Sequence, residues 1–241
     1  MSAGLGAVAD AYVLRARLFP ATLAVLPLTL VALLVVPPGL LAKVLPFAFS
    51  AGVVFLLTQW VRDRGVKLQD RLLERWGGWP TTSMLRYTGS LDHEVVLQRR
   101  RRLLEEVTGI TLPTAADEAT DPAAEAVYHA ATRALVSKVR ARPGAERVQD
   151  ENVAYGFRRN LLALKPFGLA LTGIALAVDA FWLAPLAPIA ALACAGAHLL
   201  IVLAWITVVT PDFVHRQARV YAQRLFETLE DTRLAPDAKS S

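Results

Sequence analysis

The sequence predicts an all-α integral membrane protein in which two transmembrane helical hairpins, four spans in all, flank a helical cytoplasmic domain. Three observations lead to this fold class. Residues 167–209 form a run of 43 residues whose only acidic or basic side chains are Asp179 and His198. A second apolar stretch covers residues 18–61, and basic residues gather at the ends of both stretches. A spanning helix needs roughly 20 apolar residues, so each stretch has room for two spans.

The composition separates the chain into apolar and charged blocks. Hydrophobic residues make up 54% of the chain and charged residues 20%. Residues 62–166 carry 18 of the 26 Lys and Arg and 14 of the 21 Asp and Glu, and this segment is long enough for one small soluble domain. The net charge of +5 is modest. Much of it lies beside the apolar blocks, which favours membrane topology and anionic lipid over nucleic acid as its cause.

The first hairpin is expected after a short cytoplasmic N-terminus, residues 1–17. Residues 18–36 contain no charge and exceed the roughly 7 to 15 apolar residues of a cleavable signal peptide, so we interpret them as a retained span. Pro27 predicts a kink within this span. Pro37-Pro38-Gly39 then breaks the helix, and residues 40–61 form the second span.

Basic residues at the span ends predict the orientation, because cytoplasmic loops of membrane proteins accumulate Lys and Arg. The two hairpin tips together contain only Lys43. The other span ends carry basic residues throughout: Arg15, Arg17, Arg62, Arg64, Lys67, Arg158, Arg159, Lys165, His215, Arg216 and Arg219. We therefore expect a multi-pass protein of the cytoplasmic (inner) membrane, with both termini and residues 62–166 in the cytoplasm.

The middle domain, residues 62–166, shows helical periodicity throughout. Helix-breaking residues divide it: Gly77, Gly109 and Pro143. The pattern predicts helices over residues 61–76, 91–107 and 123–141, and a last helix from about residue 148 that continues into the third span. Residues 111–114 are expected to form a loop.

The second hairpin is predicted to consist of spans 167–183 and 188–209, joined by a turn at Pro185 and Pro188. The single cysteine, Cys194, falls inside the fourth span, so we expect neither a disulfide framework nor a thiol metal site. Residues 210–241 open with Thr210-Pro211-Asp212, a typical helix start. They form an amphipathic helix and tail, which we expect to pack on the middle domain, on a partner subunit or along the membrane surface.

Polar residues within the spans are the first candidates for a functional site, because ionisable groups are costly in lipid. Four of them fall near the bilayer midplane: Thr29, Ser50, Thr172 and His198. Either they converge on a water-accessible seam or interhelical hydrogen bonds, or the hydroxyls bond to their own helices and His198 stays neutral against one neighbour. Asp179 lies about one turn from the outer end of its span, and we expect it to reach water.

The run Arg99 to Arg102 is the most conspicuous charge cluster. Four consecutive helical residues spread around the whole circumference, and Arg101 and Arg102 precede Glu105 and Glu106 by four positions. We therefore expect a solvated helix with ordinary surface ion pairs. The alternative is that Arg99 and Arg102 bind an anionic ligand, nucleotide or lipid headgroup, with assistance from Arg86 or Arg133.

No enzyme signature is present. The chain contains no phosphate-binding G-x-x-x-x-G-K-[ST], no G-x-S-x-G and no H-E-x-x-H, and its four histidines are scattered without metal-ligand spacing. We expect no catalytic residues, no cofactor and no metal.

Several short stretches of the chain together resemble a known protein family. The most specific is Glu151-Asn152 followed by Tyr155-Gly156-Phe157-Arg158-Arg159-Asn160. With Arg62-Asp63-Arg64-Gly65 and Gly77-Gly78-Trp79-Pro80, it resembles a family of uncharacterised bacterial integral membrane proteins, mainly over residues 60–166. The resemblance transfers no activity to individual residues. At most it implies a membrane protein of the kind encoded beside bacterial defence genes.

The same stretch has a physical interpretation of its own. On a helix, Asn152, Tyr155 and Arg159 share one face, and Arg158 and Arg159 lie about two turns from the third span. These residues either anchor the domain or bind a ligand, such as a lipid headgroup.

The leading functional hypothesis is a channel-like or defence-type membrane effector. Its cytoplasmic domain would sense a partner or ligand and alter membrane permeability. The alternatives are a non-conducting membrane scaffold that recruits a cytoplasmic partner, and a small transporter. The expected partners are the lipid bilayer, further copies of the chain, and a cytoplasmic protein or anionic small molecule.

Overall fold

The computed structural model describes residues 14–37, 39–40, 51–88, 93–121, 123–140 and 145–230. Within these residues the regular elements are helices and no strand occurs, which confirms the all-helical class. Three helices are long and apolar enough to cross a membrane: Leu14–Val35, Glu146–Leu186 and Pro188–Thr207. They correspond to the predicted first, third and fourth spans. Much of the predicted second span, residues 40–61, lies outside the described residues.

The chain forms two compact units. The described parts of Met1–Arg71 and Val153–Val214 are called the hairpin unit below, and those of Leu72–Asn152 and His215–Ser241 the helical unit. Three helices contribute residues to both units: α4 (Ala51–Trp76), α9 (Glu146–Val178) and α12 (Pro211–Glu227). Each unit has a hydrophobic core of its own.

The hairpin unit begins with η1 (Leu14–Leu18), a π-helical turn that leads directly into α2 (Phe19–Val35). Pro27 lies inside α2 without ending it. Later in the chain, α9 continues through Pro166 to Val178, so the middle domain and the third span share one unbroken helix, as the sequence predicts.

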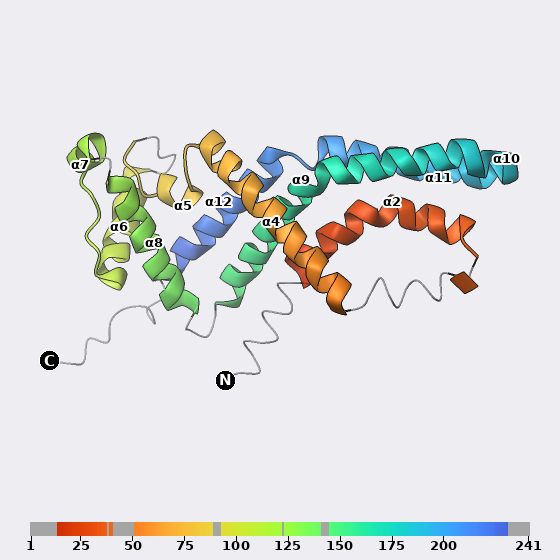
Figure 1. The fold of residues 1–241 in the computed structure, drawn as a ribbon. Helices are drawn as coiled ribbons and strands as arrows, with labels where there is room; N and C mark the ends of the chain where they lie inside the picture. The colour runs from red at the N-terminus through yellow and green to blue at the C-terminus, as the bar shows by residue number, and fades with distance from the viewer. Residues whose placement is uncertain are drawn as a thin grey trace. The chain divides into compact units, whose positions relative to one another are not determined.

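The hairpin itself is built from α9, the π-helical turn η2 (Asp179–Leu183), α10 (Ala184–Leu186) and α11 (Pro188–Thr207). The chain reverses at Ala187, whose φ of −150° and ψ of 74° are not helical. Figure 1 shows α11 returning beside α9, with α10 at the tip. The turn lies where the two prolines predict it.

Buried apolar residues from several helices form the core of the hairpin unit. Its largest member is Trp205, whose indole lies directly over Gly168. A Cβ atom at position 168 would overlap the ring, so only glycine fits there. The rings of Trp60 and Phe167 meet edge to face with centroids 5.0 Å apart. The buried members of this core are Ala21, Ala24, Val61, Leu161, Leu164, Trp205 and Val209.

Large apolar side chains also cover the outside of the hairpin unit. More than half of the surface of each of the following is exposed: Leu33, Phe181, Leu186, Ile189, Leu192 and Leu200. A soluble protein rarely exposes so many large apolar side chains on neighbouring helices. The surface is suited to contact with lipid.

The helical unit contains α5 (Pro80–Ser83), α6 (Glu94–Thr108), α7 (Ala115–Thr120), α8 (Ala124–Arg140) and η3 (Thr228–Glu230), together with the adjoining parts of the three shared helices. α4 and α6 end at Gly77 and Gly109, each with a φ of 72°. Glycine adopts that left-handed conformation at no steric cost, which explains why both helices end where the sequence predicts.

Helix α7 was not predicted from the sequence. Thr114 accepts a hydrogen bond from the backbone N–H of Asp117 (3.3 Å), and the Asp117 carboxylate accepts one from the backbone N–H of Thr114 (3.0 Å). The hydrogen bonds from Thr114 lower the pKa of Asp117. This capping box was readable as Thr-x-x-Asp directly after the expected loop.

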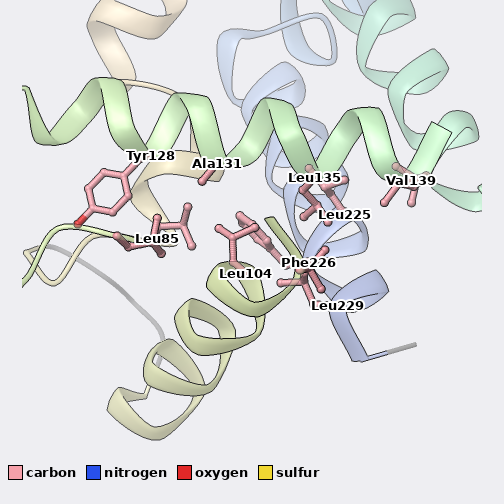
Figure 2. Close-up of a cluster of buried hydrophobic side chains, with 12 residues drawn as sticks. Leu85, Leu104, Tyr128, Ala131, Leu135, Val139, Leu225, Phe226 and Leu229 are labelled. Carbon is pink, nitrogen blue, oxygen red and sulfur yellow. The ribbon is translucent and has the colours of Figure 1, made fainter. Parts of the chain in front are cut away.

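Figure 2 shows the core of the helical unit, where side chains from α6, α8 and the C-terminal helices converge. Leu104 of α6 and Leu135 of α8 are fully buried, and so is Leu225 of α12. The C-terminal helix therefore packs on the middle domain, one of the three sites expected for it.

Candidate functional site

The hairpin unit buries one pair of ionisable side chains among apolar helices. Asp179 begins η2 and His198 lies in the middle of α11. Asp179 precedes the reversal at Ala187 by about two helical turns, and His198 follows it by about three. The hairpin therefore brings them to a similar depth, and their side chains are 2% and 0% exposed.

Both ring nitrogens of His198 have a hydrogen-bond partner. Nδ1 lies 2.6 Å from Oδ2 of Asp179, and Nε2 lies 3.1 Å from the backbone carbonyl oxygen of Pro27 in α2. A carbonyl oxygen can only accept, so Nε2 carries a proton and donates it. The other contact needs a second proton, held on Nδ1 or on the carboxyl. Either arrangement makes the pair neutral overall, which suits an apolar environment.

The second carboxylate oxygen, Oδ1 of Asp179, is buried and has no hydrogen-bond partner among the described residues. A buried acceptor without a donor costs about 1–3 kcal/mol. Asp179 also begins a π-helical turn, an irregularity that often occurs at functional sites. Among the described residues, the pair therefore has partners for both ring nitrogens of His198 and for Oδ2 of Asp179, but none for Oδ1.

This geometry corrects the expectation for Asp179. The helical path continues past Asp179 to Leu186 instead of ending one turn later, so the carboxylate lies deeper than predicted and turns toward His198. His198 also has two partners rather than the single neighbour anticipated for it. Both residues were singled out from the sequence, but not as a pair. Their similar distances from the predicted turn were the available signal.

The other intramembrane candidates do not join this site. The hydroxyl of Thr29 donates to the carbonyl of Val25 (3.2 Å), and that of Thr172 donates to the carbonyl of Gly168 (2.6 Å). Both bond within their own helices, so the simpler of the two interpretations holds for them. Ser50 lies outside the described residues.

Residues 155–160 of α9, the stretch that suggested a family resemblance, form a second polar cluster in the hairpin unit. Arg159 and Tyr155 both donate to Oε1 of Gln69 in α4, the tyrosine at 3.3 Å. Arg158 donates to the carbonyl of Phe213 (3.1 Å) and lies over its ring. The two arginines and the tyrosine thus contact the protein itself, which favours the anchoring interpretation. Asn152, on the same helix, is half-buried and belongs to the helical unit.

Asn160 was not among the predicted site residues, yet it is the most deeply buried polar group of this cluster. Its amide donates to the carbonyl of Ala16 (2.7 Å). A Cβ at position 65 would overlap its Oδ1. Gly65 and Asn160, both in the stretches that suggested a family, are therefore required by packing.

Arg101 contradicts the expected solvated helix. It is 4% exposed. Its guanidinium donates to the carbonyls of Leu85 and Pro113 and to the hydroxyl of Tyr128 (3.1 Å). The expected Arg101–Glu105 ion pair does not form, because Glu105 instead accepts from the backbone N–H of Leu112 (2.6 Å). A buried arginine within a run of four could not be recognised from helical spacing alone.

Tyr128 extends the Arg101 network. Its hydroxyl donates to Oε2 of Glu118 (2.7 Å). Burial raises the pKa of Tyr128 to about 12, which keeps the donor protonated at neutral pH.

Arg99 and Arg102 behave as surface groups. Arg99 lies 3.3 Å from Glu230, and Arg102 lies 3.7 Å from Glu106, both largely exposed. Arg86 is paired with Glu125 in the helical unit. The structure therefore does not gather these side chains into one anion site.

Among the described residues, no group of three or more His, Cys, Asp or Glu side chains could hold a metal ion. In comparisons with protein-family models, curated proteins and solved structures, no match to this chain was found. By the chain's own geometry, the buried Asp179–His198 pair is the strongest candidate site.

Proposed function

We propose that this chain is a non-enzymatic, multi-pass protein of the cytoplasmic membrane that alters membrane permeability when its cytoplasmic helical domain senses a protein partner or an anionic ligand. Residues 40–61 form the second of four spans, both termini lie in the cytoplasm, and the protein works as a homo-oligomer. The proposal is supported chiefly by one observation, the Asp179–His198 pair buried in the apolar hairpin unit.

Ionisable side chains within spans are costly and mark ion paths, proton relays or switches far more often than ordinary packing positions. Hydrogen bonds between uncharged hydroxyls or amides could join helices at lower cost. Oδ1 of Asp179 has no donor among the described residues, which further argues against a purely structural pair, because such a pair is expected to satisfy both oxygens.

The pair also links three elements, since η2 supplies the carboxylate, α11 the imidazole and α2 the carbonyl of Pro27. A change in its hydrogen bonds changes how α2 packs on the hairpin. Gating requires a site coupled to an element with two arrangements. In this proposal, the Asp179–His198 pair is the site and α2 is the element that changes its packing.

A voltage-sensitive dye in bacterial cells that express the chain tests the proposal. We expect induction of the wild type to lower the membrane potential and His198→Ala to change that effect at equal membrane abundance. Thr22→Val is the matched control, because the exposed Thr22 hydroxyl donates within α2, to the carbonyl of Phe19 (2.9 Å). It should match the wild type.

A second candidate, the non-conducting scaffold, is favoured by one surface of α6. Val95 is 70% exposed, and by helical spacing it shares a face with Arg99 and Arg102, as in many protein-binding surfaces. A membrane potential that stays unchanged with inserted wild-type protein would contradict the permeability proposal and favour the scaffold.

A further inference from the structure

The hydrogen bonds around His198 can be counted as protons. The contact with the Pro27 carbonyl requires a proton on Nε2, and the contact with Asp179 Oδ2 requires another between Nδ1 and the carboxylate. Two hydrogen bonds therefore need two exchangeable protons. With one proton, only one of the two contacts can persist.

We infer that the Asp179–His198 pair is an intramembrane proton-binding site, and that its second proton holds α2 against the hairpin. The inference rests on the proposed function in placing the pair within the membrane, and deepens it by naming the ligand of the same site. It does not depend on whether the protein conducts ions.

Loss of the second proton leaves two arrangements, and each breaks a contact. If Nε2 keeps its proton, the Nδ1 lone pair faces a carboxylate at 2.6 Å and repels it. If the proton moves to Nδ1, the bond to Asp179 survives, but the Nε2 lone pair then faces the Pro27 carbonyl. The second arrangement is favoured because it keeps a donor on the buried carboxylate, and it releases α2.

Asp179 is poised for exchange because its Oδ1 already lacks a donor among the described residues. A water molecule that reaches this oxygen can accept the second proton from the carboxyl group and carry it away, and α2 is released after that loss. A pair that served only to fasten helices would gain from a second donor at Oδ1.

Few other titratable groups lie on the elements that pack here. α2 and α10 contain none, and η2 contributes only Asp179. α11 contributes His198 and, one turn earlier, Cys194. Cys194 is the only cysteine in the chain. It is a native reporter beside the proposed site.

The test is the rate at which a membrane-permeant maleimide labels Cys194 in the full chain, reconstituted in vesicles of phosphatidylethanolamine and phosphatidylglycerol, between about pH 5 and 9. Thiolate formation alone raises the rate up to tenfold per pH unit. The control is Ala193→Cys in a Cys194→Ser background, because residue 193 is exposed at nearly the same depth. We expect the ratio of the Cys194 rate to the control rate to rise at least tenfold with pH.

Asp179→Asn sharpens the test. The amide can donate to Nδ1 while Nε2–H still donates to Pro27, so the variant imitates the doubly protonated pair without a carboxyl group that can lose its proton. Its rate ratio should stay constant across the pH range. Simple ionisation of Asp179 without movement would instead slow Cys194, since a nearby negative charge disfavours the thiolate.

A wild-type ratio that is flat or falls with pH overturns the inference, and this comparison requires no substitution at position 179. The outcome is separable from the proposed function. A pH-dependent ratio with an unchanged membrane potential keeps the proton site and removes the permeability proposal. A flat ratio with an altered membrane potential removes the proton site and keeps the permeability proposal.

Discussion

Each unit of the molecule buries ionisable side chains, but the two units differ in how completely those side chains are hydrogen-bonded. In the helical unit, Arg101 is surrounded by two carbonyls and a tyrosine hydroxyl, and it also lies over the rings of Tyr87 and Tyr128. In the hairpin unit, the Asp179–His198 pair leaves Oδ1 without a donor among the described residues. A fully satisfied network specifies a structure, whereas an incomplete one has capacity for a ligand.

The largest expected effect comes from breaking the hairpin pair on one side. His198→Leu should destabilise the protein by about 3–5 kcal/mol, because it leaves the Asp179 carboxylate buried without its donor. Unfolding by a denaturing detergent, followed by far-UV circular dichroism, measures this loss.

The double variant His198→Leu with Asp179→Leu is the control for that measurement. Replacing both partners by apolar groups removes the unpaired charge, so most of the stability should return. Losses that simply add in the double variant would show that the two side chains do not act as a pair.

A slightly smaller effect is expected at the satisfied site. Arg101→Met should cost about 3 kcal/mol, because it leaves the carbonyls of Leu85 and Pro113 buried without donors. Thermal unfolding of the full chain measures it. Arg102→Met on the same helix is the matched control and should stay within about 0.5 kcal/mol, since its contact with Glu106 is exposed. Equal losses would mean that Arg101 is not buried in solution.

The smallest effect concerns alkaline pH. The pKa of Tyr128 is about 12 in the folded chain and 10.0 for an ordinary tyrosine. A raised folded pKa means that the stabilisation is complete below pH 10 and is lost as pH rises toward 12. The wild type should lose roughly 1–2 kcal/mol over this window. Tyr128→Phe should not show that part of the loss, as equilibrium unfolding at several pH values can establish.

Much of the fold could be predicted from the sequence because apolar length and helix-breaking residues act locally. The reversal between Pro185 and Pro188 and the helix end at Gly109 are examples. The partner of His198 could not be assigned in the same way, because it depends on how α11 and η2 are rotated about their axes. The burial of Arg101 depends on Leu85 and Pro113, which are distant from it in sequence. The local sequence therefore could not distinguish Arg101 from the other arginines of the run.

The acceptor that α2 offers to His198 is the main-chain carbonyl of Pro27, not a side chain. No exchange of the amino acid at position 27 can delete that oxygen, so a mutational scan of α2 would not identify it by loss of a functional group. Substitutions can change the hydrogen-bonding groups of this junction only at positions 179 and 198. Within α2, it can act only by changing the shape of the helix.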